Sequence, residues 1–359
     1  MNEDFEYVET QDSLIRCCKR LKFEKEIGVD IECENNFHHY GVYISIIQIS
    51  TPTENFIVDV LKLKEIFPLI DILENKEITK IFHNVDFDFR ILGKQFGCRP
   101  KNIFDTQQAA VFLGKKDLGL GALLCEYFNI EKHKHFQKAD WTTRPINKGM
   151  LSYAVKDSLY LIRLRHILQD ELKKIHKFEW IKEEFKSIEL KLWEYPSFSF
   201  KSIKGYKSLT DKERGILKEI FDVREVIAKR VNKPVHFIIS NKNLLGIVKN
   251  PPNKIVFWKN LRGVHPAVRE NAHKFFYAIQ EGQKHIIMIK RVKRLKYTEK
   301  QKKQITELSV LREDIGHKLG LSPHLIMSKD QMKHMVIDQN LNILKDWQRK
   351  LVEGKFNFK

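Results

Sequence analysis

The feature that most constrains this 359-residue chain is a pair of carboxylates inside an otherwise apolar segment. Asp30 and Glu32 interrupt an apolar run that begins at Ile27. In an extended strand, successive side chains point to opposite faces, so both carboxylates share one face while Val29 and Ile31 take the other. Neighbouring carboxylates repel each other and resist desolvation. This face must therefore be exposed to solvent or neutralised by a cation.

Further acidic residues follow on other elements. Asp88 comes after the apolar, strand-like run 78–82 and close to the start of a helical pattern at Asp86. Asp86 suits the capping of that helix, which leaves Asp88 to face the site. Tyr153 and Asp157 stand four residues apart in a helical pattern and so project from one face. Taken singly, these residues also fit an exposed strand face, a helix cap and a core tyrosine.

Taken together, the four carboxylates and the tyrosine predict a metal-dependent site that hydrolyses phosphodiesters. Two divalent cations about 3.5–4 Å apart activate water and stabilise both the phosphate charge and the leaving oxygen. Carboxylates suit Mg²⁺ or Mn²⁺, and no cysteine cluster or His-x-x-x-His pattern indicates zinc. A carboxylate pair also fits a glycosidase, but that chemistry does not require four acids and a tyrosine. Gly119-Leu120-Gly121 lacks the third glycine of a dinucleotide-binding motif.

Strand and helix patterns alternate over the first 195 residues. Short β-rich segments at 42–49 and 55–60 are bounded by turn residues. Helical patterns occupy about 61–73, 86–96, 120–128 and 148–174. Strands followed by interleaved helices predict a mixed α/β domain over residues 1–195.

The back half differs sharply in charge. Residues 201–359 hold 35 lysines and arginines against 15 aspartates and glutamates, a net charge of +20, whereas residues 1–200 hold 29 against 31, a net charge of −2. A strongly basic half indicates a polyanionic partner, although a solvated, lysine-rich helical surface would have the same composition. The densest stretch, 290–296, fits contact with such a polyanion and a solvated linker equally well. Three neighbouring aromatics fit a helical core better than base stacking: Phe275, Phe276 and Tyr277.

The back half also contains an internal repeat with an offset of 88 residues. Arg224–Arg230 recurs as Arg312–Lys318, and His236–Ser240 recurs as His324–Ser328, with six of 17 paired positions identical. The repeat predicts two copies of a small helical module, whereas chance similarity between amphipathic helices is the alternative. The expected boundaries are a linker at 196–207 and modules at 208–286 and 298–359.

Composition argues against several protein classes. Hydrophobic residues make up 42% and charged residues 31% of the chain, as in an ordinary folded protein. Five cysteines without a Cys-x-x-Cys pair argue against a disulfide framework and favour a reducing compartment. The acidic start, Met1–Asp4, leads into no signal sequence, and no apolar run approaches the roughly 18 residues of a membrane span. We therefore expect a soluble, intracellular protein without a membrane partner.

The three acidic motifs resemble those of a known superfamily. Asp-x-Glu at 30–32, His-Asn-x-x-x-Asp at 83–88 and Tyr-x-x-x-Asp at 153–157 are similar to the motifs of the DEDD exonucleases, in the subgroup with tyrosine in the third motif. The ribonuclease D family, with the related exosome-associated nuclear exonucleases, is the most similar branch. This likeness spans roughly residues 5–180 and extends to further segments at 104–107, 118–124 and 139–145.

The resemblance implies a ribonuclease H-like (DnaQ-like) α/β exonuclease domain followed by all-α HRDC helical modules. It further implies 3′–5′ release of nucleoside 5′-monophosphates from RNA with a single-stranded 3′ end, such as tRNA precursors or other structured RNAs. The implied cofactors are two divalent metal ions, Mg²⁺ or Mn²⁺. Protein partners are not indicated.

The resemblance also implies roles for individual residues. Asp30, Glu32 and Asp157 are expected to bind the metal that holds the attacking water, with Asp30 bridging to a second metal. Asp88 is expected to support that second metal, and Tyr153 to orient the water. Three further residues are expected to contact substrate: His83, Gln137 and Arg144. The stretches 105–106 and 141–145, the latter including Arg144, are expected to be mainly structural.

Two other functions fit the same motifs. A single-stranded DNA exonuclease of the Werner type shares this active site, and a non-catalytic RNA-binding scaffold would keep only the fold. The chain has neither the additional N-terminal domain nor the long C-terminal tail typical of the nuclear enzyme, which favours a stand-alone, cytoplasmic ribonuclease D. Segments 40–41 and 48–51 are closer to the nuclear type, so a nuclear location fits if the source is a eukaryote.

Overall fold

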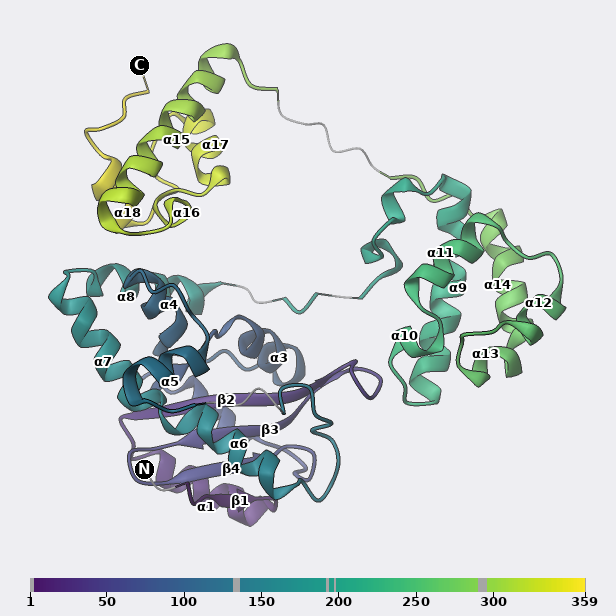
Figure 1. The fold of residues 1–359 in the computed structure, drawn as a ribbon, viewed down its shortest axis with the longest axis horizontal. Helices are drawn as coiled ribbons and strands as arrows, with labels where there is room; N and C mark the ends of the chain where they lie inside the picture. Colours follow the sequence, from purple (N-terminus) through teal and green to yellow (C-terminus); the bar gives the residue numbers. More distant parts are fainter. Residues whose placement is uncertain (1–2, 132–135, 192–193, 197, 290–295, 359) are drawn as a thin grey trace.

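A computed structural model describes residues 3–131, 136–191, 194–196, 198–289 and 296–358. Within these residues the first part is a mixed six-stranded sheet flanked by helices (Figure 1). Its strands are β1 (Glu6–Val8), β2 (Glu26–Asn35), β3 (Val42–Ser50), β4 (Asn55–Asp59), β5 (Thr79–Phe82) and β6 (Ile103–Asp105). Their order in the sheet is β1-β4-β3-β2-β5-β6. β3 runs antiparallel to β2 and β4, and the other neighbours are parallel.

Eight helices accompany the sheet in the described part of residues 3–191. They are α1 (Gln11–Leu21), α2 (Phe67–Glu74), α3 (Asp86–Phe96), α4 (Thr106–Phe112), α5 (Leu120–Phe128), α6 (Lys148–Leu159), α7 (Leu161–Lys174) and α8 (Phe178–Leu190). The α/β fold expected from the sequence is therefore present. Two helix predictions were wrong in their bounds. The pattern at 61–73 starts only at Phe67, where Pro68 occupies the first turn, and the pattern at 148–174 breaks at Tyr160.

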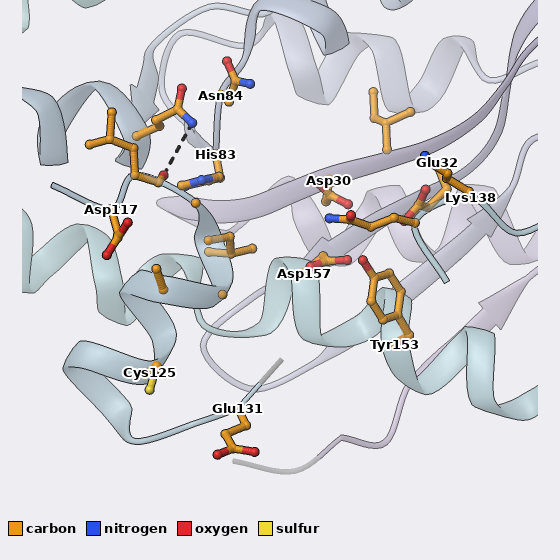
Figure 2. A pocket seen from close by; sticks show the side chains of 18 of the residues that line it. Asp30, Glu32, His83, Asn84, Asp117, Cys125, Glu131, Lys138, Tyr153 and Asp157 are labelled. Carbon is orange, nitrogen blue, oxygen red and sulfur yellow. Dashed lines mark hydrogen bonds between the residues drawn. The ribbon is translucent and has the colours of Figure 1, made fainter. Parts of the chain in front are cut away.

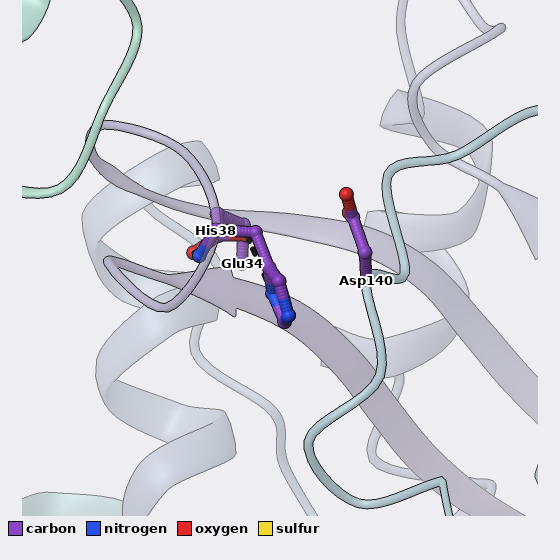
Figure 3. A group of neighbouring side chains, drawn as sticks. All are labelled: Glu34, His38 and Asp140. Carbon is purple, nitrogen blue, oxygen red and sulfur yellow. Dashed lines mark hydrogen bonds and ion pairs between the residues drawn. The ribbon is translucent and has the colours of Figure 1, made fainter.

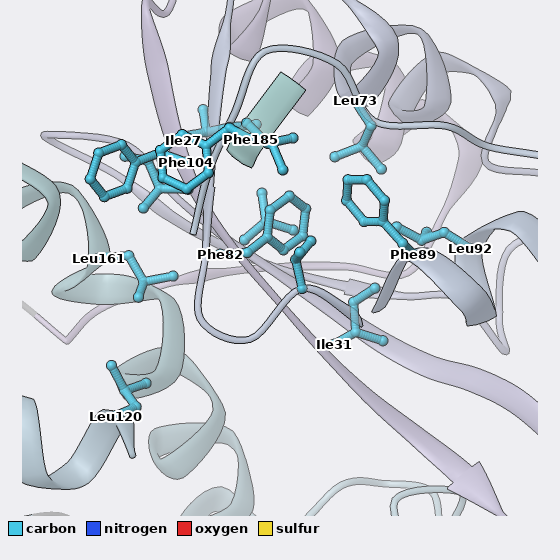
Figure 4. Close-up of a cluster of buried hydrophobic side chains, with 14 of the residues drawn as sticks. Ile27, Ile31, Leu73, Phe82, Phe89, Leu92, Phe104, Leu120, Leu161 and Phe185 are labelled. Atoms are coloured by element: carbon cyan, nitrogen blue, oxygen red, sulfur yellow. The ribbon is translucent and has the colours of Figure 1, made fainter. Parts of the chain in front are cut away.

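The core of this domain lies on both faces of the sheet. Val29 and Ile31 of β2 are buried, as the alternation of that strand predicted. Figure 4 shows Ile31 near Phe82 and Phe89, whose rings meet edge to face with centroids 5.9 Å apart. Aromatic pairs of this kind add to the hydrophobic effect of burial.

The back half is helical throughout its regular elements, as expected. The first helical group comprises α9 (Asp211–Arg230), α10 (Val235–Ile238), α11 (Asn241–Lys249), α12 (Ile255–Asn260), α13 (Pro266–Glu270) and α14 (Ala272–Lys284). The second helical group comprises α15 (Glu299–Leu319), α16 (Pro323–Ile326), α17 (Lys329–Asp338) and α18 (Asp346–Val352). The first group has a hydrophobic cluster of its own, whereas the buried residues of the second group belong to the cluster of the α/β domain.

The 88-residue repeat corresponds to repeated local structure. Thr210 and Thr298 each begin a long helix with a reciprocal capping box. Arg224 and Arg312 are both buried, and each donates a hydrogen bond to a backbone carbonyl 15 residues later. Ser240 and Ser328 cap α11 and α17. The identical residues of the repeat therefore have structural roles, which makes chance similarity a poor explanation.

The structure agrees with some of the other expectations for the back half and differs from others. Part of the segment 196–207 is folded: Ile203 and Tyr206 are buried in the cluster of the first helical group. Phe275 is a core residue as expected, but Tyr277 is 60% exposed, because residues two apart on a helix point in nearly opposite directions. The basic stretch 290–296 lies outside the described residues except for Lys296.

Two further observations concern the whole described chain. Its cysteines are free thiols, at Cys17, Cys18, Cys33, Cys98 and Cys125. Among the described residues, none of the helices combines the length and the apolar character needed to cross a bilayer.

Candidate active site

The site begins on β2, where a glycine allows a helix to approach the two carboxylates. Gly28, Asp30 and Glu32 share one face of the strand. A Cβ atom on Gly28 would lie 2.5 Å from the carbonyl oxygen of Ser158 in α6, so only glycine permits this contact. The hydroxyls of Ser50 and Ser158 add a hydrogen bond of 2.7 Å between β3 and α6. This close packing sets the residue before Ser158, Asp157, beside β2.

Three of the predicted carboxylates meet at this point. Asp30, Glu32 and Asp157 each offer an oxygen, and these oxygens lie within 4.8 Å of one another. Figure 2 shows the three carboxyl groups turned toward one another, with the Tyr153 ring at their side. The expectation that β2 and α6 supply one common group of acids is therefore met by the geometry.

Asp88 lies close to this group and, like Asp157, is buried. Its pKa is raised well above the usual value, first by burial and then by the charges of Asp30, Asp105 and Glu32. A buried carboxylate beside other carboxylates keeps its proton unless a cation offsets the repulsion. The electrostatics of Asp88 thus place it in the same acidic cluster.

The start of α3 is held differently from the prediction. Asp86 makes no cap; its carboxylate pairs with Arg90, one turn later, at 2.7 Å. The backbone amides of Asn84 and Val85 instead donate to the two oxygens of the buried Asp105, each at 3.0 Å. Asp105 also caps α4, so one carboxylate fixes both helix starts near the site.

Tyr153 is buried against two aromatic rings. The centroids of Phe136 and Trp141 lie 5.9 and 6.2 Å from its own. Burial, followed by the charges of Glu32 and Asp30, raises the pKa of the phenol, while a hydrogen bond from Gln137 lowers it. The net shift is upward, so the hydroxyl keeps its proton at neutral pH and can both donate and accept hydrogen bonds.

The three residues expected to contact substrate fall into two classes. His83 and Gln137 line the same pocket as the acids, whereas Arg144 does not. His83 Nδ1 lies 2.9 Å from Thr106 Oγ1, whose own proton is donated to the carbonyl of Phe82. The neutral ring therefore carries its proton on Nδ1, which leaves Nε2 as an acceptor.

Arg144 is engaged inside the domain. Its Nε and Nη2 atoms bond the two oxygens of the buried Asp59 at 2.6 and 2.8 Å, and Nη1 donates to the carbonyl of Trp141 at 2.7 Å. This bonding agrees with the structural role expected for the 141–145 stretch. Substrate contact by Arg144 has no support in this geometry.

The pocket around the acids has a volume of about 990 Å³. Several of its polar side chains were not singled out from the sequence, namely Asn84, Gln107, Asp117 and Lys138. Among them, Lys138 is the strongest candidate for a functional role. Figure 2 places it on the side of Glu32, and its positive charge is opposite to that of the acidic cluster. Its position next to Gln137 was the only available signal in the sequence.

The donor set fits a hard divalent cation. Clustered carboxylate oxygens are the ligands that Mg²⁺ and Mn²⁺ prefer. Burial, followed by repulsion from the neighbouring carboxylates, raises the pKa of Asp88, and a bound cation would offset both effects. Asp30, Glu32 and Asp157, with Asp88 behind them, are the residues of this structure suited to hold such ions.

Comparison with known proteins agrees with this geometry. Residues 5–173 match a family model described as 3′–5′ exonuclease. The chain is 29% identical over 299 residues to the exosome complex exonuclease RRP6 of Saccharomyces cerevisiae, an alignment that covers 78% of this chain and 41% of the relative. It is 27% identical over 329 residues to ribonuclease D of Desulfotalea psychrophila, covering 89% and 86%. The chain thus spans less than half of the length of the yeast relative.

A solved structure extends the likeness to the helical groups. The crystal structure of Escherichia coli RNase D superposes with a TM-score of 0.71 at 19% identity, covering 99% of this chain and 100% of the other. At this identity the likeness concerns the fold. Exonucleases of the matched family use divalent metal ions, in agreement with the cluster of acids. Residues 5–173 are therefore a DEDD 3′–5′ exonuclease domain, in a chain homologous to RRP6 and to bacterial ribonuclease D.

Proposed function

We propose that this chain is a 3′–5′ exoribonuclease that releases nucleoside 5′-monophosphates from RNAs with a single-stranded 3′ end. The observation that carries the proposal is the convergence of Asp30, Glu32 and Asp157 within 4.8 Å in one pocket. The names of the two sequence relatives, an exosome exonuclease and a ribonuclease, support RNA as the substrate. Precursors of tRNA and other structured RNAs are the proposed natural targets.

The residues that line the pocket, together with Asp88 beside it, would divide the work as follows. Asp30, Glu32, Asp88 and Asp157 would hold two divalent ions, which supply an activated water and a positive field for the phosphate and the leaving oxygen. Tyr153, which keeps its proton, would fix the orientation of the attacking water through its hydroxyl. His83 and Gln137 line the pocket and would contact the 3′-terminal nucleotide.

We further propose that the two helical groups are HRDC modules that hold RNA beside an exonuclease domain at 1–195. The proposed bounds are 208–286 and 298–359, after a linker at 196–207 whose Ile203 and Tyr206 pack on the first module. The repeated capping boxes and buried arginines support a common origin for the two copies. Their basic charge supports contact with phosphates. An intracellular location, cytoplasmic or nuclear, is part of the same proposal, and the free thiols agree with it.

Two other functions make different predictions. A single-stranded DNA exonuclease would degrade a matched DNA at least as fast as RNA, and a scaffold would bind RNA without shortening it. The test is a time course with a 3′-extended tRNA and a matched DNA, both labelled at the 5′ end, in Mg²⁺, Mn²⁺ or EDTA. We expect a metal-dependent ladder that shrinks from the 3′ end of the RNA. Binding without shortening in every metal would favour the scaffold.

A matched pair of variants separates the cluster from its surroundings. Asp88→Asn removes a carboxylate of the cluster, whereas Asp86→Asn removes an exposed carboxylate from the same helical turn, which pairs with Arg90. We expect cleavage to fall below detection in Asp88→Asn and in Asp30→Asn, and to stay within about twofold in Asp86→Asn. Tyr153→Phe should lower kcat by roughly 10²-fold or more. Undiminished cleavage in Asp30→Asn would refute the metal assignment.

A further inference from the structure

One loop of the exonuclease domain lies between the catalytic pocket and the first helical group. The hairpin tip, residues 36–41, joins β2 to β3. Its Phe37 lines the catalytic pocket and is 48% exposed, so much of its ring is accessible to a bound molecule. An aromatic ring at the mouth of a nuclease pocket offers a flat surface on which a nucleobase can stack.

The hairpin tip is held firmly from below. Glu34 is buried, and its Oε1 accepts hydrogen bonds from the backbone amides of Phe37 and His38, the second at 3.1 Å. Figure 3 shows Glu34 and His38 beside Asp140, with ligand atoms within 4.8 Å of one another. Because the Glu34 carboxylate is already used by the two amides, we assign this group to the folding of the tip and not to a second metal.

The other side of the tip is fixed to the segment that carries Gln137 and Lys138. His39 Nε2 lies 2.9 Å from Asp140 Oδ2. Although burial raises the pKa of Asp140, hydrogen bonds from Thr142 and His39 lower it to about 2, so this carboxylate stays charged. The hydrogen bonds to Glu34 and Asp140 therefore hold the loop in place and fix the position of Phe37 at the pocket.

The same tip is joined to the first helical group, where α9 ends and α10 begins. The Tyr40 amide donates to Asn232 Oδ1 at 3.2 Å, and Asn232 Nδ2 lies 3.2 Å from His39 Nδ1. The Tyr40 hydroxyl donates to Glu225 Oε2 at 3.0 Å. Figure 1 shows the β2–β3 hairpin reaching toward the end of the helical group that carries α10.

This end of the helical group is strongly basic. Residues 226–237, which we call the α9–α10 corner, contain three cations and no carboxylate; the carboxylate of Glu225, just before them, accepts from the Tyr40 hydroxyl. Lys229, Arg230 and Lys233 are all exposed, and none of them forms an ion pair with a carboxylate of the described chain. Since Asn232 lies within three residues of each, the tether brings all three cations to the tip that carries Phe37.

We propose that the single-stranded RNA reaches the catalytic pocket across the α9–α10 corner, with Lys229, Arg230 and Lys233 binding its phosphates and Phe37 stacking on a base. This inference rests on the proposed exoribonuclease function and names the surface that guides its substrate. Phe37 and Tyr40 are three residues apart, at most about 10 Å of chain, so the corner lies within a few nucleotides of the cut. Phosphate contacts of this kind are independent of sequence, as an advancing exonuclease requires.

The binding test compares two triple variants with the same change in charge. One is Lys229→Glu/Arg230→Glu/Lys233→Glu at the corner. The control is Lys254→Glu/Lys259→Glu/Lys274→Glu. These three lysines are exposed; Lys254 and Lys259 belong to the start and body of α12, and Lys274 belongs to α14. Figure 1 places α12 and α14 on the side of the helical group away from α10. The probe is a fluorescent 20-nucleotide single-stranded RNA in EDTA, titrated at several salt concentrations.

We expect the corner triple to weaken binding by about 10- to 100-fold at 0.1 M salt. It should also reduce the slope of log K against log salt by about 2, because roughly 0.7 is lost for each phosphate contact in a single strand. The control triple should change the affinity by less than threefold. Equal losses in both triples, or an unchanged salt slope in the corner triple, would overturn the proposal and leave the corner to another anionic partner.

The cleavage test separates this proposal from the proposed function. With a dinucleotide, which is too short to span the few nucleotides between the cut and the corner, the corner triple should keep the wild-type kcat and KM, while KM for the 20-nucleotide RNA rises. Phe37→Ala should raise KM for both RNAs by roughly 5- to 100-fold at unchanged kcat, and Phe37→Trp should restore it. If the wild type cleaves neither RNA, the proposed function fails, and the binding test in EDTA still decides whether the corner holds RNA.

Discussion

The two helical groups share the same sequence repeat but pack against different parts of the protein. Both start with a capped long helix and a buried arginine bonded to a carbonyl. In the first group, the fully buried Trp258 stacks on Phe275 of the same group at 4.7 Å. In the second, Trp347 stacks on Trp180 of α8 at 5.2 Å and meets Phe112 of α4 edge to face. One copy closes its own core, and the other completes the core of the exonuclease domain.

The difference teaches that a repeat fixes local structure without fixing how each copy packs. Polar contacts reinforce the attachment of the second copy. The buried Lys177 donates to the carbonyl of Leu319 at 2.9 Å, and the Trp347 indole donates to Glu184 at 2.9 Å. The first copy is held to the exonuclease domain through the hairpin tip described above. The second group should therefore unfold with the exonuclease domain, and the first should unfold as a unit of its own.

The largest expected effect comes from the two tryptophans. Replacing a buried tryptophan with alanine costs roughly 3–5 kcal/mol. Trp347→Ala should lower the stability of the exonuclease domain and of α15–α18 together, whereas Trp258→Ala should lower only that of α9–α14. Hydrogen exchange read by mass spectrometry in increasing urea resolves the three regions within one sample.

The pair of tryptophan variants tests directly whether the two helical groups differ in their packing. Each variant is the control of the other, because both remove the same side chain from an equally buried position. If Trp347→Ala left the exonuclease domain unchanged and released only α15–α18, the shared core would not be cooperative. A loss in all three regions with both variants would instead mean that the chain unfolds as a single unit.

A smaller effect should distinguish the regions by pH. Lys80 of β5 is fully buried, and its ammonium donates to the carbonyls of Asn75 and Ile78. Burial lowers its pKa to about 8, against the raising effect of Glu189. Above that pH the folded protein loses this proton while the unfolded chain, with an ordinary lysine pKa near 10.5, retains it. Stability therefore rises with pH between about 8 and 10.5 and is lost as pH falls through 8.

The measurement is the difference in unfolding free energy between wild type and Lys80→Met, which cancels the titration of other groups. From pH 7.5 to 9 this difference should change by about 1 kcal/mol for the exonuclease domain. The second helical group should follow the same pH dependence, and the first should show none. A pH effect confined to the exonuclease domain would contradict the shared core.

Much of the exonuclease domain could be predicted from sequence because its signals are local. The alternation in β2 and the four-residue spacing of Tyr153 and Asp157 are set by backbone geometry alone, and both describe the observed faces. The helix at 86–96 and the helix at 120–128 also match, since glycine or asparagine ends each of them in a left-handed conformation.

The rest depends on contacts between distant segments. That α6 can approach β2 depends on the missing Cβ of Gly28, and the residues before α3 are held by Asp105 instead of by Asp86. The engagement of Arg144 with Asp59 spans 85 residues. No spacing rule reports such pairings. The docking of Trp347 on Trp180 is of the same kind, because an amphipathic helix shows its apolar face but not its partner.

The smallest expected effect concerns the two capping boxes, which are alike in sequence and differ in context. Thr210 lies beside packed chain: the Ile287 amide donates to the carbonyl of Asp211, and Arg214 bonds the carbonyl of Leu209. The first turn after Thr298 is largely exposed.

Replacing either threonine with alanine removes one cap hydrogen bond, worth about 1 kcal/mol. Thr210→Ala should therefore lower the stability of the whole first group by about that amount. Thr298→Ala should speed exchange of the Gln301 amide, which loses the Thr298 hydroxyl as its acceptor, and leave Trp347 and the exonuclease core unchanged. Equal global losses from both variants would mean that the start of α15 is as firmly packed as the start of α9.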